Sequence, residues 1–209
     1  MTINKDKIIG VILAGGLSKR MKGGNKFLKE LNGKPIIELV KNKASKQVTK
    51  LIINANVQSA KLKKFKLTIV KDTVKGFRGP LAGILSAMEF VEKKKIKWLA
   101  TFPCDAPFFP INLVEKLINK ARQRKCKIVF AESNKISHPV FGVWDVSLKK
   151  SLIKTLIDED KKKMELFIKK HPYSKVNFPF SDLDPFFNIN NKEEFDIAKK
   201  YVKQLNLYN

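Results

Sequence analysis

The chain has 209 residues, 44% of them hydrophobic, so it is long enough for one domain with a sizeable core. No apolar run approaches the length of a membrane span, which argues against an integral membrane protein. The net charge of +24 raises nucleic-acid binding as a possible function, but only four of the 43 basic residues are arginines, and the lysines are spread along the whole chain. Because arginine is the commoner residue for reading bases and clamping phosphates, we do not expect specific nucleic-acid binding.

The cysteines and histidines argue against a structural metal site. Cys104, Cys126, His138 and His171 are far apart in sequence and lack zinc-ligand spacing. The first residues, MTINKDKII, lack the apolar block and the cleavage site of a signal peptide. We therefore expect a cytoplasmic protein with reduced thiols and no membrane association, and we expect it to be a monomer.

Strand-like and helix-like segments alternate along the chain, as in an α/β fold. Strands are expected at residues 8–13, 51–56, 67–70, 98–102, 128–131 and 140–144. Helices are expected at the segment that Pro35 opens as first helical residue, after Pro80, at 112–124, from Ser147, around 164–170 and from Lys192. The alternation predicts a single domain in three layers, α/β/α, with a mainly parallel sheet between helices on both faces.

Polar and glycine residues follow the predicted strands on one edge of this sheet. In chain order they are Ala14, Gly15 and Gly16 after the first strand, Asn54 and Asn56 at the second, Asp72 after the third and Asp105 after the strand at 98–102. Ligands of open α/β sheets bind beyond the carboxyl ends of the strands. The sequence therefore predicts a site for a charged, polar ligand at this edge.

The loop from Gly15 to Lys26 has the composition of a phosphate-binding segment. Its glycines allow backbone N–H groups to approach phosphate oxygens, and Arg20 and Lys26 can neutralise a polyphosphate. Asp105 can hold Mg²⁺, which needs one or two protein carboxylates besides phosphates and waters. These groups suit displacement at phosphorus.

Familiar motifs of other chemistries are absent from the sequence. The loop matches neither the P-loop pattern G-x-x-x-x-G-K-[ST] nor the dinucleotide fingerprint G-x-G-x-x-G. No Ser/His/Asp or Cys/His arrangement is visible along the chain, so we do not expect acyl transfer.

The motif L-A-G-G-x-S-x-R-M, followed by Lys26, resembles the signature loop of nucleotidyltransferases that activate a phosphorylated substrate with an NTP. Five further blocks resemble, in order and spacing, those of the molybdenum cofactor guanylyltransferase family. They are LNGKP (31–35), GPLAG (79–83), PCDAP (103–107), HPV (138–140) and FNIN (187–190). The resemblance implies a Rossmann-like nucleotidyltransferase fold.

The resemblance also implies an activity. Members of that family transfer GMP from GTP to the terminal phosphate of molybdopterin cofactor, with Mg²⁺, and release pyrophosphate. Residues of about 1–105 would then form the nucleotide-binding part of the domain, and residues of about 106–209 the part that binds the acceptor. Partners that insert the finished cofactor into enzymes are expected as well.

Individual roles follow from the same resemblance. Leu13, Ala14, Gly15, Gly16, Lys26, Asn54, Asp72 and Asp105 would bind GTP, and Asp105 would also bind the metal. Lys26 would contact the phosphates, and Arg20 would stabilise the departing pyrophosphate. The acceptor side would include Lys162, Lys163, Asn188 and Asn190. We hypothesise that Asp72 accepts hydrogen bonds from the guanine N1–H and N2–H₂ groups.

The loop departs from the family pattern at two positions: Asn25 stands where the family usually has aspartate, and Lys22 where it has glycine. The Asn25 change leaves open a protein that binds the cofactor without activity. A sister enzyme that uses CTP on molybdopterin, or an NTP on a sugar phosphate, also stays open.

Each acidic residue has a structural alternative, since Asp105 suits a helix cap and Asp72 suits a turn. His138 fits a structural or cleft-lining residue better than a catalytic base.

Overall fold

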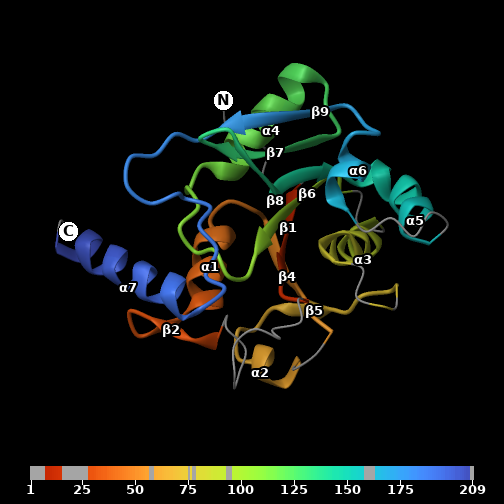
Figure 1. Ribbon diagram of the computed structural model, residues 1–209. Helices are drawn as coiled ribbons and strands as arrows, with labels where there is room; N and C mark the ends of the chain where they lie inside the picture. The colour runs from red at the N-terminus through yellow and green to blue at the C-terminus, as the bar shows by residue number, and fades with distance from the viewer. Residues whose placement is uncertain are drawn as a thin grey trace.

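A computed structural model describes residues 8–15, 28–56, 59–74, 76, 79–92, 96–157 and 163–207. A seven-stranded sheet forms its centre, in the order β5-β4-β1-β6-β8-β7-β9, and β2 and β3 form a separate hairpin (Figure 1). All strands of the large sheet run parallel except β8, which is antiparallel to both of its neighbours. The strands are β1 (Ile8–Leu13), β2 (Glu30–Leu31), β3 (Lys34–Pro35), β4 (Lys50–Asn54), β5 (Thr68–Val70), β6 (Trp98–Pro103), β7 (Ile128–Ser133), β8 (Ile136–Asp145) and β9 (Tyr173–Asn177).

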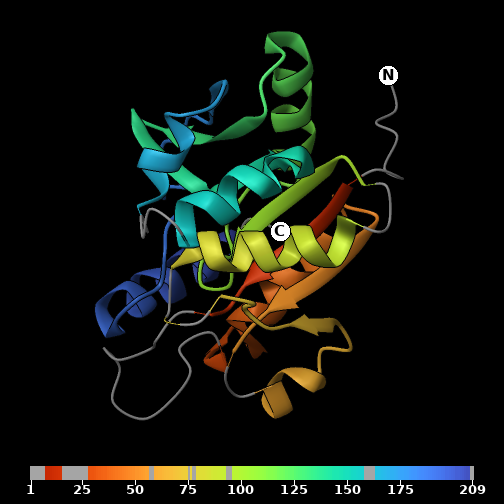
Figure 2. The same ribbon diagram turned by 90° about the vertical axis from the view of Figure 1, so that its right-hand side faces the viewer.

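Helices cover both faces of the sheet, which confirms the predicted three layers (Figures 1 and 2). One face carries α1 (Ile36–Ser45), α2 (Ser59–Lys63) and α4 (Leu113–Arg124), and α7 (Lys192–Leu207) lies outside α1. The other face carries α3 (Pro80–Glu92), the short 3₁₀ helix η3 (Val146–Leu148), α5 (Lys149–Ile157) and α6 (Met164–Ile168). Among the helices in the described part of the chain, none combines the length and the apolar character that a membrane span needs.

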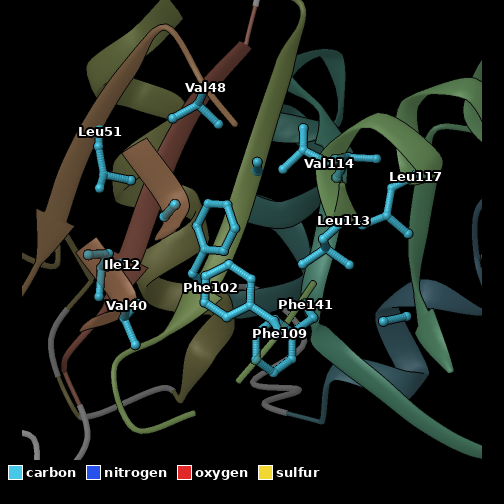
Figure 3. Close-up of a cluster of buried hydrophobic side chains, with 14 of the residues drawn as sticks. Ile12, Val40, Val48, Leu51, Phe102, Phe109, Leu113, Val114, Leu117 and Phe141 are labelled. Atoms are coloured by element: carbon cyan, nitrogen blue, oxygen red, sulfur yellow. The ribbon is translucent and has the colours of Figure 1, made fainter. Parts of the chain in front are cut away.

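The larger core lies between the sheet and the layer of α1 and α4. Phe102 of β6 packs against Phe109, whose ring in turn packs against Phe141 of β8, with ring centroids 5.2 and 5.6 Å apart (Figure 3). Gly10 allows this close packing, because a Cβ there would lie 2.8 Å from Leu51 Cδ1. Burial of these aromatic and aliphatic side chains supplies most of the driving force that holds the layer on the sheet.

A second core lies between the sheet and the layer of α3, α5 and α6, and it explains why α3 is apolar on nearly every side. Leu81, Leu85 and Met88 are each buried by 99% or more, between β1, β4 and the helix α5. A helix this apolar has to lie inside a protein, because it has no face that favours water. Its position fixes the first turn of α3 against the ends of β1 and β4.

The structure corrects one detail of the sequence prediction. Pro35 is not the first helical residue: its backbone is extended (φ −54°, ψ 139°), it ends β3, and α1 begins at Ile36. The short hairpin of β2 and β3 takes up the proline, and its turn places Asn32 and Gly33 at positive φ (53° and 72°). Two consecutive positive φ values are the signature of the tight hairpin turn that Asn-Gly favours.

Candidate active site

Four parallel strands end level with one another, and this sets the geometry of the site. Val70 pairs with Asn54, Asn54 with Leu13, and Leu13 with Pro103, across β5, β4, β1 and β6. The residues two positions further along therefore form the next row: Asp72, Asn56, Gly15 and Asp105. The backbones of Asp72 and Asp105 are thus three strand spacings apart, which corresponds to about 14 Å. The row thus brings together four strand ends at one edge, as the sequence predicted.

Two asparagines hold Asp72 at one end of the row. Asn54 Nδ2 donates to Asp72 Oδ1 at 2.7 Å, and Asn56 Nδ2 donates to Asp72 Oδ2 at 2.6 Å. The Asp72 N–H donates in return to Asn56 Oδ1 at 2.8 Å. Each carboxylate oxygen has two lone pairs, so the side-chain hydrogen bonds among the described residues leave one acceptor position on each Asp72 oxygen. Asp72 is thus a fixed, half-buried acceptor pair.

Asn54 is a buried residue that supports Asp72 and is not itself at the surface of the site. Its side chain is buried, with 2% of the residue exposed, and it also donates to the Val70 carbonyl at 3.3 Å. Two glycines flank it: a Cβ on Gly83 of α3 would lie 2.3 Å from Asn54 Oδ1, and one on Gly15 would lie 3.2 Å from that atom. The second glycine of the GPLAG block is therefore needed for the position of Asn54.

Asp105 and the two asparagines of the FNIN block are close in the chain fold at the other end of the row. The Ile189 N–H donates to the Asp105 carbonyl at 2.9 Å, so Asn188 and Asn190 flank the residue that is bonded to Asp105. Asp105 is half-buried and Asn188 is exposed. Asn191, not Asn190, caps α7: its Oδ1 accepts from the Glu194 N–H at 2.8 Å. The FNIN block is thereby attached to the PCDAP block.

Of the other predicted residues, several are not described and one, Lys163, lies in the opposite layer. Gly16, Arg20, Lys26 and Lys162 lie outside the described residues, as do Lys22 and Asn25. Lys163 is exposed and precedes α6, in the layer with α3 and α5, whereas Asn190 precedes α7 in the opposite layer (Figure 1). The structure therefore does not place Lys163 beside Asn188 and Asn190.

Sequence reasoning missed two features of this region. Asn56 was noted after β4 but not given a role, although its amide binds both the backbone and the side chain of Asp72.

A Ser/His/Asp cluster also exists: Ser133, His138 and Asp184 are in hydrogen-bond contact. Ser133 is fully buried, so this cluster does not offer a nucleophile to a substrate. The position of Asn56 two residues past a strand end was the signal for the first feature; the second had none in sequence.

A separate pocket of about 370 Å³ opens between α1, α7 and the segment after Asp105. Its lining is Asn32, Lys34, Leu39, Asn42, Lys43, Lys46, Pro107, Phe108, Ile111 and Val202. None of the predicted site residues is among them. Burial lowers the pKa of the Lys43 ammonium from 10.5 to about 8.

Comparisons with known proteins identify the class of enzyme to which this fold and site belong. The family model described as MobA-like NTP transferase domain matches residues 10–174. A molybdenum cofactor guanylyltransferase from Nitrobacter hamburgensis is 36% identical over 202 residues, which cover 96% of this chain and 97% of the relative. The chain therefore belongs to the molybdenum cofactor guanylyltransferase family, and it is a nucleotidyltransferase.

Solved structures share the fold at lower sequence identity. Molybdopterin-guanine dinucleotide biosynthesis protein A from Archaeoglobus fulgidus aligns with a TM-score of 0.74 at 21% identity, covering 94% of this chain and 99% of its own. A Mycobacterium tuberculosis protein, crystallised in complex with manganese, aligns with a TM-score of 0.66 at 12% identity and covers 93% and 98%. These likenesses confirm the predicted single-domain nucleotidyltransferase fold.

Proposed function

We propose that the protein transfers GMP from GTP to the terminal phosphate of molybdopterin cofactor, in a reaction that needs Mg²⁺. The observation that carries this proposal is the row of Asp72, Asn56, Gly15 and Asp105, in a member of this family. An extended nucleoside triphosphate is long enough to span the three strand spacings, about 14 Å, between Asp72 and Asp105. Its base would lie at Asp72, and its phosphates would lie towards Asp105.

At the base end, the acceptor positions that the described hydrogen bonds leave on Asp72 match the guanine N1–H and N2–H₂ donors. Adenine and cytosine do not present two such donors on neighbouring atoms. A site built to accept two hydrogen bonds rejects a base that lacks the donors, because its acceptors would be left unpaired. The amides of Asn54 and Asn56 would hold the carboxylate in the orientation that this recognition needs.

At the phosphate end, the available donors fit a hard divalent cation. The Asp105 carboxylate and the amide oxygens of Asn188 and Asn190 are ligands of the kind that Mg²⁺ takes, with phosphates and waters completing the set. Among the described residues, no group of three His, Cys, Asp or Glu gathers into a denser metal site. When bound, the ion would neutralise charge on the triphosphate. The manganese complex of the Mycobacterium tuberculosis protein supports a divalent ion in this fold.

The other roles rest on the resemblance and on the chemistry of the side chains. Lys26 would bind the phosphates, and Arg20 would stabilise charge on the departing pyrophosphate. The acceptor phosphate would approach from the side of Asn188 and Asn190, so that its oxygen attacks the α-phosphorus of GTP. Pyrophosphate then leaves, and catalysis consists of positioning and charge neutralisation.

Base preference provides the first test. Calorimetric titration of the protein with GTP, CTP, ATP and UTP, each with Mg²⁺, should show GTP binding at least tenfold more tightly than the others. Tighter binding of CTP would overturn the assignment in favour of the cytidylyl enzyme.

The role of Asp105 is tested by Asp105→Ala. We expect GMP transfer to fall by a factor on the order of 10³ with folding intact, because the metal and the triphosphate lose their carboxylate. Asp145→Asn is the matched control, since Asp145 pairs with Trp98 at the opposite edge of the sheet. Pyrophosphate release from GTP and cofactor is the measurement, and turnover retained in Asp105→Ala would count decisively against the metal assignment.

A further inference from the structure

The cluster of Ser133, His138 and Asp184 connects three segments that are distant in sequence. Ser133 ends β7, His138 lies in β8, and Asp184 lies between β9 and α7. Ser133 Oγ donates to Asp184 Oδ2 at 2.8 Å and lies 2.6 Å from His138 Nε2. The side chains of His138 and Asp184 are only 15% and 20% exposed. The cluster is therefore an internal polar network.

The direction of these hydrogen bonds excludes a hydrolytic role. The single hydroxyl proton of Ser133 goes to the carboxylate, so the hydroxyl oxygen accepts from His138 Nε2–H. Burial lowers the pKa of the His138 imidazole, with Asp184 and Glu132 opposing this effect, so the ring is neutral at pH 7. In a nucleophilic triad the serine gives its proton to the histidine, whereas here it gives it to the aspartate.

Asp184 in turn fixes the segment that leads to the FNIN block. Its Oδ1 accepts from the Phe186 N–H at 2.8 Å, and its carbonyl accepts from the Phe187 N–H at 2.9 Å. The Phe186 ring packs against the His138 ring, with centroids 4.9 Å apart. Histidine therefore holds this segment twice, through the serine and through the aromatic contact.

The far end of the same segment is attached to the nucleotide side, since the Ile189 N–H donates to the Asp105 carbonyl at 2.9 Å. Asn188 lies between the two attachments and is exposed. A backbone that is fixed on both sides of an exposed amide is preorganised to contact a ligand. The Ser133 network supplies one of the two attachments.

We propose that Ser133 and His138 are positioning residues for the acceptor: through Asp184 they hold the segment of Asn188 and Asn190 in the geometry that receives the molybdopterin phosphate. This inference rests on the proposed function. The residues touch no substrate themselves. They set how well the acceptor binds, and they have no contact with the end of the row where the base would lie.

The test separates acceptor binding from GTP binding. Ser133→Ala removes the hydroxyl between His138 and Asp184, and His138→Leu removes the ring donor. Both variants should raise the KM for molybdopterin cofactor about tenfold, the loss expected for one hydrogen bond to a charged group, and should leave the Kd of GTP with Mg²⁺ within about twofold of wild type. His138→Gln keeps an amide donor and should restore much of the affinity.

Ser151→Ala is the matched control. Ser151 and His171 form another Ser–His contact, 3.0 Å long, between α5 and the end of α6 on the opposite side of the sheet. Loss of the Ser151 hydroxyl should change neither the KM for molybdopterin cofactor nor the Kd of GTP. The proposal is overturned if Ser133→Ala behaves like Ser151→Ala, or if its GTP affinity falls as much as its acceptor affinity.

Hydrogen exchange tests the positioning role independently of GMP transfer. The Phe186, Phe187 and Ile189 amides should be protected in the wild type and should exchange at least tenfold faster in Ser133→Ala. If wild type transfers no GMP, the proposed function fails, while this measurement still reports the positioning. Unchanged exchange at these amides would overturn the positioning role itself.

Discussion

At the scale of single residues, the candidate site depends on glycines as much as on charged groups. Gly83 lies where α3 packs against the ends of β1 and β4, and any side chain there would displace the buried Asn54. Asn54 is in turn one of the two donors to Asp72. The position of the predicted base acceptor thereby depends on a glycine that acts through Asn54.

Replacing Gly83 by alanine should weaken GTP binding at least tenfold. The new Cβ would lie 2.3 Å from Asn54 Oδ1 and 2.9 Å from Leu13 Cδ2, so Asn54 has to move and its bond to Asp72 is lost. Overpacking should also cost about 1–3 kcal/mol of unfolding free energy. Titration calorimetry and thermal unfolding measure the two effects.

Gly33→Ala provides the control for that substitution. Gly33 has φ +72° and open space around it, so alanine strains the hairpin turn without touching the site. It should lower stability by about 1 kcal/mol and leave GTP binding unchanged. Equal loss of GTP affinity in both variants would show that Gly83 acts only through stability.

The sequence was informative about residues at strand ends and uninformative about residues that meet across the fold. Gly15, Asp72 and Asp105 could be predicted to share an edge, because parallel strands in one sheet end on the same side. The bond between Ser133 and Asp184 joins residues 51 positions apart, and no local pattern marks either one. The pairing depends on the course of the chain after β9.

At the scale of elements, strands rich in aliphatic residues could be predicted from sequence, and strands without them could not. The core strands β1, β4 and β6 are mostly apolar and buried along most of their length, and the sequence predicts all three. β9 has the sequence YSKVN at the sheet edge, is only partly buried, and was not predicted, because its one aliphatic residue, Val176, gives no apolar run. In β8, Pro139 argues against a strand, so the sequence predicts the strand only from residue 140 onward. The structure accommodates Pro139 where the register between β7 and β8 shifts, between Phe130 and Ala131.

Helix α1 contains a partly buried lysine that the fold tolerates at a cost. Lys43 lines the pocket beside α7, with Nζ 5.4 Å from the Phe109 ring centroid. Because its pKa is about 8 in the folded protein against 10.5 in the unfolded chain, the unfolded chain binds more protons between these values. The contribution of Lys43 to stability therefore becomes less unfavourable as pH increases through this window.

Lys43→Met should remove this cost. We expect the unfolding free energy to increase by about 1–2 kcal/mol at pH 7, and the advantage over wild type to shrink between pH 8 and 10.5. Denaturant titrations across that range measure it. Lys200→Met, at an exposed position on α7, is the control, and a pH-independent difference would show that the gain is not due to the charge.

At the scale of the whole molecule, net charge is the dominant feature. With 43 basic and 19 acidic residues, the protein attracts anions wherever its surface is not locally neutralised. Some lysines are paired, such as Lys175 with Glu132 at 2.7 Å. The proposed substrates, a nucleoside triphosphate and a phosphorylated cofactor, are both anionic, so the charge favours their encounter with the protein.

The kcat/KM for GTP should therefore fall about three- to tenfold between 20 and 300 mM KCl, because salt screens long-range attraction. Sucrose at equal osmolality is the control and should have little effect. Steady-state rates at low GTP concentration measure the change. A rate that does not respond to salt would show that no net field acts at the nucleotide site.

The position of β8 has a consequence for how such enzymes acquire new acceptors. β8 inserts between β6 and β7, and the buried Thr101 hydroxyl of β6 donates to the Val140 carbonyl at 2.7 Å and accepts from Trp144 Nε1 at 3.1 Å. A recombination event that exchanged everything after residue 105 would replace β8. The new strand would have to make the same hydrogen bonds with the Thr101 hydroxyl of β6. The segment between β9 and α7 has matching requirements of its own, since Phe186 and Ile189 are buried and Asp184 accepts from the buried Ser133 hydroxyl. Divergence in acceptor choice is therefore expected to accumulate as substitutions at exposed positions of this segment, such as Asn188, while the two parts of the gene are inherited together.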